Sequence, residues 1–143
     1  MGNGGFIIKI RCQDSWGAGH YGASRDSGKR KHLGIDIINH VNEAVCAYEA
    51  GRVTKIGYPY NQDGSEKAFY RYIEITCTDD TRQRYFYIEP LVQIEQVVSK
   101  GDILGSAQDL GIVYPGIVQH VHFEIKKNGR FINPTEYVKN VVI

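Results

Sequence analysis

Residues 119–134, QHVHFEIKKNGRFINP, are the stretch that decides the fold. Apolar and polar side chains alternate through its first half, as expected of a β-strand with one buried face. The predicted core face carries Val121, Phe123 and Ile125. The opposite face carries His120, His122 and Glu124. Two histidines two positions apart on a strand lie about 6–7 Å apart at the backbone, so both can serve one small site.

Similar short segments, rich in valine, isoleucine and tyrosine and separated by glycines and polar turns, fill the rest of the chain. The predicted strands span residues 6–12, 33–38, 44–58 (two strands around Gly51), 68–78, 82–90, 101–108 and 119–127. Two short helices are predicted, over residues 90–98 and over residues 134–141, where Pro134 suits a first turn. This spacing predicts a mostly β protein with largely antiparallel pairing. The length of 143 residues suits one domain, residues 1–143.

Composition excludes several classes of function. The hydrophobic fraction is 42% and the formal net charge is +1, with the charges spread along the chain, so we expect no nucleic-acid-binding surface. No apolar run approaches about 18 residues, so we expect no membrane span. The opening MGNGGFIIKI lacks the features of a secretory signal, so none is expected. Three cysteines, Cys12, Cys46 and Cys77, are an odd number without metal-site spacing, and free thiols are the default expectation.

The segment HLGID places His32 and Asp36 four residues apart. On a straight strand four residues span about 13 Å, so the two side chains converge only if the chain bends, and Gly34 lies between them to allow it. With His122 they make two imidazoles and one carboxylate, which leaves a fourth position for water, as in hydrolytic zinc sites. His120 would then sit beside that water as a general base or an oxyanion donor. A polar strand face without metal is the alternative that composition and spacing leave open.

The sequence resembles the lysostaphin/LytM-type zinc endopeptidases, most of which cut peptide bonds in bacterial peptidoglycan. The similar segments occur in the family's order: SRDSGKRKHLGIDI, AVCAYEAGRVTKIG, VSKGDILGSAQDLG and HVHFEIKKNGRFINPTEYV. The resemblance is strongest over residues 17–138. It implies a compact fold of two antiparallel sheets, similar to a duplicated hybrid motif, with the site in a groove. It also implies one Zn²⁺ held by His32, Asp36 and His122, with His120 as a catalytic histidine and a peptidoglycan peptide as substrate.

One departure bears on activity. The family's peptidases carry a second catalytic histidine where this chain has Tyr87, in YFYIEP. That segment and GIVYPGIVQHVHFE resemble the leukocyte cell-derived chemotaxin subgroup, zinc-binding relatives that lack peptidase activity; the cysteine pairs of that subgroup are not reproduced here. A disabled zinc-binding recognition module is therefore the alternative function, and a structural piece of a phage particle or secreted effector is a third. A tyrosine hydroxyl can donate to an oxyanion but is a poor general base near neutral pH. His20 is a candidate substitute.

Loop residues around the expected groove are candidates for binding the substrate. Arg25 could hold a substrate carboxylate or pair with Asp26, and Tyr21 and Tyr114 could supply rigid contact surface, as could Tyr58 and Tyr60. Glu124 could orient a ligand histidine or make a cross-strand pair. The implied substrate places the site of action at the cell wall or periplasm.

Overall fold

The computed structural model describes residues 10–11, 14, 16–25 and 30–138. Within these residues the strands form a seven-stranded sheet of order β12-β11-β7-β6-β5-β9, with β3 paired to β11, and a three-stranded sheet of order β4-β10-β8. The larger sheet consists of β3 (Ile35–Ile38), β5 (Gly51–Gly57), β6 (Tyr72–Cys77), β7 (Thr81–Phe86), β9 (Val97–Val98), β11 (His120–Lys127) and β12 (Arg130–Ile132). The smaller sheet consists of β4 (Ala44–Cys46), β8 (Ile88–Pro90) and β10 (Ile103–Ala107). The expected mostly β fold of antiparallel sheets is confirmed.

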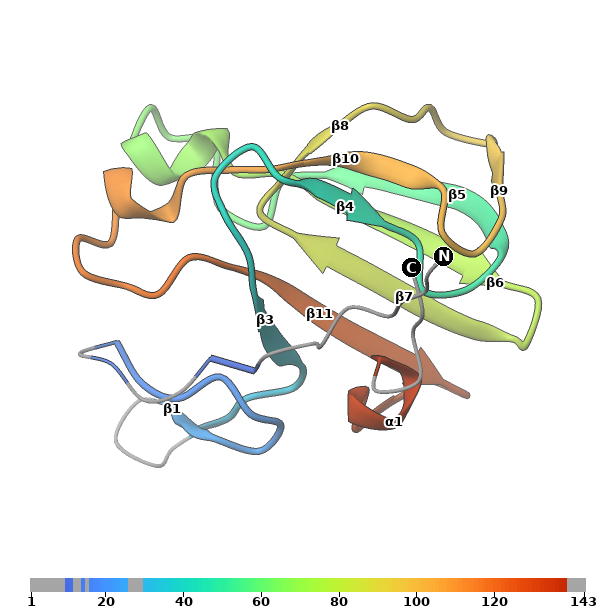
Figure 1. The fold of residues 1–143 in the computed structure, drawn as a ribbon, viewed down its shortest axis with the longest axis horizontal. Helices are drawn as coiled ribbons and strands as arrows, with labels where there is room; N and C mark the ends of the chain where they lie inside the picture. The colour runs from blue at the N-terminus through green and yellow to red at the C-terminus, as the bar shows by residue number, and fades with distance from the viewer. Residues whose placement is uncertain (1–9, 12–13, 15, 26–29, 139–143) are drawn as a thin grey trace, which may run out of the picture.

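Three kinds of short element complete the described fold. Strands β1 (Ser24–Arg25) and β2 (Arg30–Lys31) pair with each other. Two 3-10 turns span Glu66–Phe69 and Leu110–Ile112. Helix α1 (Thr135–Val138) lies near the end of β11 in Figure 1, whereas β1 lies away from the smaller sheet.

The core lies between the two sheets and draws apolar side chains from both. Val121, Phe123 and Ile125 are buried in it, so the predicted inward face of β11 is confirmed. From the smaller sheet, Val45 and Leu104 pack into the same cluster. Burying one face of β11 leaves the other face, with its two histidines, for β3 and the loops that surround it.

The register of β3 on β11 determines what can happen on that second face. The two strands run antiparallel, and Asp36 lies opposite His122 while Ile35 lies opposite Phe123. Side chains directly across an antiparallel pair approach to about 4.5–5.5 Å at Cβ. The carboxylate of Asp36 is therefore brought to His122 by strand pairing alone.

Some sequence expectations need correction. The predicted helix over residues 90–98 is wrong: the chain turns there and then forms β9. Its backbone N–H groups serve other strands, since Leu91 donates to Leu104 and Glu95 donates to Val53. Glu95 also has a φ of 77°, in the left-handed region that no α-helix continues through.

Two other expected elements differ in extent. The strand predicted from residue 68 begins only at Tyr72, because the preceding residues form the 3-10 turn Glu66–Phe69. The helix predicted over residues 134–141 is confirmed for Thr135–Val138, and residues 139–141 lie outside the described residues. Of the strand predicted over residues 6–12, Ile10 pairs with Ile37 as an isolated bridge, while residues 6–9 and Cys12 lie outside the described part. Cys46 and Cys77 are free thiols.

Candidate metal centre

His32 reaches the centre from outside β3, through a bend at Gly34. A Cβ atom placed on Gly34 would lie 2.3 Å from the carbonyl oxygen of Phe123 and 3.0 Å from Cε1 of His122. Glycine is thus required here by the close approach of the chain to β11, in addition to the bend that the sequence predicts. The close approach is what lets His32 and His122 meet.

Three donor atoms converge in the centre, one from each of His32, Asp36 and His122. Nε2 of His32 lies 2.9 Å from Nδ1 of His122. Oδ1 of Asp36 lies 3.1 Å from the first nitrogen and 2.9 Å from the second. The three side chains are buried or nearly so, and the two imidazole rings are tilted against each other with centroids 4.7 Å apart. The structure thus brings together the three residues that the sequence singled out.

Hydrogen bonds on the far side of each ring decide which nitrogen carries a proton. Nδ1 of His32 donates to the carbonyl oxygen of His20 at 2.9 Å, because a carbonyl can only accept. Nε2 of His122 donates in the same way to the carboxylate of Glu124, also at 2.9 Å. The neutral rings therefore present bare nitrogens to the centre, the arrangement by which outer partners orient metal-binding histidines.

Electrostatics show that this centre requires a positive charge. Burial alone would lower the pKa of His122, but the carboxylates of Asp36 and Glu124 raise it to about 9. Burial would raise the pKa of Asp36, yet hydrogen bonds with His122 and His32 hold that pKa well below its ordinary value. Two bare nitrogens and a carboxylate oxygen about 3 Å apart repel one another unless a proton or a metal cation lies among them. Two imidazoles and one carboxylate at such separations fit a zinc ion with open coordination positions.

His120 lies beside the three donors, not among them. The residue is 4% exposed. Its Nδ1 donates to the carbonyl oxygen of Val118 at 2.8 Å, which leaves Nε2 bare and 3.5 Å from Oδ2 of Asp36. Burial lowers the pKa of His120 to about 4, so the ring is neutral near neutral pH. A neutral, anchored imidazole with a free nitrogen is suited to accepting a proton.

Tyr87 is held in an uncommon backbone conformation between β7 and β8. Its φ is 73°, which for an aromatic residue is strained by roughly 1–3 kcal/mol. Its ring makes an edge contact with His120, with centroids 5.8 Å apart. Its hydroxyl lies 3.2 Å from that of Tyr60, which in turn accepts a hydrogen bond from Tyr114 at 3.0 Å. Burial raises the pKa of Tyr87 well above its ordinary value, so the hydroxyl keeps its proton.

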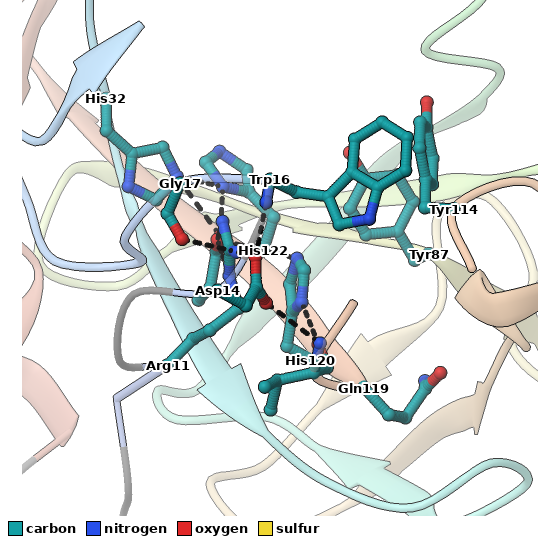
Figure 2. A network of polar contacts seen from close by, with 12 residues as sticks. Arg11, Asp14, Trp16, Gly17, His32, Tyr87, Tyr114, Gln119, His120 and His122 are labelled. Carbon is teal, nitrogen blue, oxygen red and sulfur yellow. Dashed lines mark hydrogen bonds and ion pairs between the residues drawn. The ribbon is translucent and has the colours of Figure 1, made fainter. Parts of the chain in front are cut away.

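A groove of about 600 Å³ runs past these residues. Its walls include the three donor residues, His120, Tyr87 and Glu124. Its lining also includes the aromatic side chains of Trp16, Tyr60 and Tyr114. Figure 2 shows the indole of Trp16 next to Tyr114, and the two rings meet edge to face at 5.2 Å. The lining of the groove thus combines histidine and carboxylate side chains with aromatic ones.

The remaining predicted site residues are placed in different ways. Tyr114 lines the groove as expected, but Tyr21 is partly buried against the hydrophobic core and is not among the groove-lining residues. His20 is exposed at its side chain and contributes its carbonyl group to His32, so it is not a groove residue. Arg25 belongs to β1 through its backbone, and its side chain lies outside the described atoms, as does Asp26.

Sequence reasoning missed Arg11, Asp14 and Trp16. Arg11 is 4% exposed and forms an ion pair with Asp36, with Nη2 lying 3.0 Å from Oδ2. Trp16 spans 99 positions to donate to the carbonyl oxygen of Pro115. An arginine inside an apolar, strand-like segment was the one available signal, since a buried charge calls for a partner.

In the described part of the chain, none of the helices has the length and apolarity needed to cross a membrane.

Comparison with known families matches most of the chain to one group of proteins. The sequence pattern of peptidase family M23 matches residues 30–134, a span that contains His32, Asp36, Tyr87, His120 and His122. Among solved structures, the catalytic domain of the antimicrobial peptidase lysostaphin from Staphylococcus simulans superposes with a TM-score of 0.65 at 22% identity. That match covers 87% of this chain and 92% of the other, and it shows the fold.

Sequence relatives include animal proteins. Leukocyte cell-derived chemotaxin-2 from Mus musculus is 31% identical over 134 residues, covering 91% of this chain and 80% of that protein. The protein of the same name from Bos taurus is 30% identical with the same coverage. This chain is thus similar in sequence to animal chemotaxins and similar in fold to a bacterial peptidase.

Proposed function

The chain belongs to peptidase family M23, and we propose that it is a zinc-dependent metallopeptidase that hydrolyses peptide bonds in bacterial peptidoglycan. One observation carries the proposal: a ring nitrogen of His32, a ring nitrogen of His122 and one oxygen of Asp36 converge in the wall of an open groove. These three residues would hold the zinc. When bound, zinc supplies a Lewis acid that polarises the scissile carbonyl group and lowers the pKa of a water molecule.

His120 is suited to moving the proton in this reaction. Its free Nε2 faces the same region as Oδ2 of Asp36, and its Nδ1 is fixed by the carbonyl oxygen of Val118. The ring can accept a proton from the attacking water and return it to the leaving amine. Its low pKa keeps it in the accepting form over the neutral range.

Tyr87 can contribute a hydrogen bond to the oxyanion that develops on the scissile carbonyl. Its hydroxyl is protonated, and Tyr87 lines the groove with its ring in edge contact with His120. A donor that is already positioned before reaction is worth more than one that must be ordered during it. The strained backbone of Tyr87 supports this assignment, because such conformations concentrate at functional sites.

A second candidate function has its own supporting observation. Tyr87 occupies the place of the family's second catalytic histidine, and the chain is similar to leukocyte cell-derived chemotaxin-2. In this alternative the metal is structural, and the aromatic side chains of the groove recognise a peptide without cutting it. Peptide recognition by Tyr and Trp side chains needs no general base.

Digestion of purified peptidoglycan, followed by mass spectrometry of the soluble fragments, separates the two functions. We expect new amino and carboxyl termini with the zinc-loaded protein, and none after treatment with a chelator or in the variant His122→Ala. If the wild type releases no fragment yet binds peptidoglycan peptides in a zinc-dependent manner, the recognition module replaces the peptidase. If it neither cuts nor binds them, peptidoglycan is the wrong ligand.

A further inference from the structure

The guanidinium of Arg11 makes several polar contacts beside the candidate metal centre. Its Nε donates to Oδ2 of Asp36 at 3.0 Å, and its Nη2 lies 3.0 Å from the same oxygen. Its Nη1 donates to Oδ1 of Asp14 and to the carbonyl oxygen of Gly17, both at 2.8 Å. The guanidinium is therefore fixed on two sides, and Figure 2 shows Arg11 beside Asp14 and Gly17.

The two oxygens of Asp36 consequently have separate partners. Oδ1 faces His32 and His122, at 3.1 and 2.9 Å. Oδ2 faces Arg11 on one side, and Nε2 of His120 at 3.5 Å on the other. Arginine suits this task because its fork of N–H donors can occupy one carboxylate oxygen at two points.

We propose that Arg11 is a positioning residue for the metal centre, which holds Oδ2 of Asp36 so that only Oδ1 is offered to the metal. This inference rests on the zinc site proposed above. With Oδ2 occupied, Asp36 binds through one oxygen and leaves coordination positions open for water and substrate.

The position of Arg11 is set by both strands that supply ligands. Its backbone N–H donates to the carbonyl oxygen of Asp36 at 2.8 Å, which ties it to β3. Its partner Asp14 accepts from the backbone N–H of Val118 at 2.9 Å, two residues before His120 on the approach to β11. A Cβ atom on Gly19 would lie 2.6 Å from Cβ of Arg11 and 2.8 Å from that of Asp36, so the segments are packed closely. Arg11 thus connects Asp36 to the start of β11.

Zinc affinity of the folded protein tests the inference without relying on activity. We expect Arg11→Met to weaken zinc binding by about 10–100-fold, the usual effect of removing an outer partner of a metal ligand. Arg11→Lys keeps the charge but not the fork, so its loss should be smaller. Arg84→Met is the matched control, because it removes another arginine–carboxylate pair, at 3.0 Å from Glu74, outside the groove-lining set. Competition with a chromophoric chelator measures all four proteins.

Cobalt substitution adds a readout that a merely structural role would not change. If Oδ2 is released in Arg11→Met, it can join Oδ1 on the metal and raise the coordination number. The visible d–d bands of Co²⁺ should then weaken relative to the wild type, because tetrahedral sites absorb more strongly than five-coordinate ones. The control Arg84→Met should show the spectrum of the wild type.

The outcomes are distinguishable. Weaker zinc binding and weaker cobalt bands in Arg11→Met, with Arg84→Met unchanged, support the inference. If folded Arg11→Met binds zinc with the affinity of the wild type and shows the same cobalt spectrum, the inference about Arg11 is overturned. The proposed zinc site is not affected by that result. Should Arg11→Met fail to fold, Arg11→Lys decides: a weaker affinity than the wild type supports the inference, and an equal one overturns it. A wild type that binds no zinc overturns the proposed function and this inference together.

Discussion

At the scale of single residues, the proposed reaction assigns separate tasks to His120 and Tyr87, whose rings meet edge to face with centroids 5.8 Å apart. The two side chains have opposite protonation chemistry: burial lowers the pKa of His120 to about 4 and raises that of Tyr87 well above its ordinary value. Near neutral pH the imidazole accepts protons and the phenol donates hydrogen bonds. The two roles proposed for them, base and oxyanion donor, match this difference in protonation.

His120→Ala tests the first of these roles. The substitution removes the anchored base beside Asp36, and we expect kcat to fall by about 10²–10⁴-fold. Zinc should stay bound, since His120 is not among the three converging residues. Steady-state kinetics on a peptide substrate measures kcat, and metal analysis of the same sample measures the bound zinc. An unchanged kcat would assign the proton transfer to another group.

Tyr87→Phe and Tyr87→His test the second role. The phenylalanine variant loses only the hydroxyl, and kcat should fall by about 10²–10³-fold with substrate binding little changed. The histidine variant restores the residue type of the family's peptidases and should keep or raise activity. An inactive wild type together with an active Tyr87→His would identify a disabled peptidase. An active wild type with a fully active Tyr87→Phe would show that the hydroxyl only packs.

At the scale of elements, the pairing of β3 with β11 builds the site, and Gly34 allows it. Gly34→Ala would place a Cβ 2.3 Å from the carbonyl oxygen of Phe123, so the backbones must separate. We expect a loss of stability of about 3 kcal/mol and weaker zinc binding, because His122 is displaced too. Gly111→Ala is the control: the nearest atom lies 3.2 Å away on the flexible side chain of Asp109. Urea unfolding of both variants measures their stability. Equal unfolding midpoints for Gly34→Ala and Gly111→Ala would contradict the role given to Gly34.

Much of the arrangement of β3 and β11 could be predicted from the sequence, because strand alternation and the HLGID bend are local features. They predict the buried face of β11 and the convergence of His32, Asp36 and His122. The contacts of Arg11, Asp14 and Trp16 could not be predicted, since they join residues 25, 104 and 99 positions apart. The helix expected over residues 90–98 failed for the same reason, because Leu91 and Glu95 donate to distant strands. The left-handed backbone of Tyr87 carries no glycine or asparagine signal.

At the scale of the whole molecule, the larger sheet gives the site a rigid support, and ion pairs on that sheet link its stability to pH. Burial would raise the pKa of Glu74, but hydrogen bonds from Thr54 and Arg84 lower it below its ordinary value of 4.5. A lowered pKa contributes stability above the unfolded value, and that contribution is lost as the pH falls through the folded value.

Glu74→Gln should therefore destabilise the protein near pH 7 and reduce the steepness with which stability falls below about pH 4.5. Stability against urea, measured from pH 7 to pH 3, checks this. Glu66→Gln, at an exposed position, should leave the profile as in the wild type. Parallel profiles for Glu74→Gln and the wild type would show that the pair with Arg84 contributes nothing to the acid dependence.

The most direct test of the central claim is calorimetric titration of the metal-free protein with zinc. The geometry of His32, Asp36 and His122 predicts one saturable site per chain, lost in His122→Ala and kept in His120→Ala. Binding also displaces the proton that the raised pKa of His122 retains, so the observed heat should vary with the ionisation enthalpy of the buffer. Absence of saturable binding, or binding that survives His122→Ala, would contradict the account.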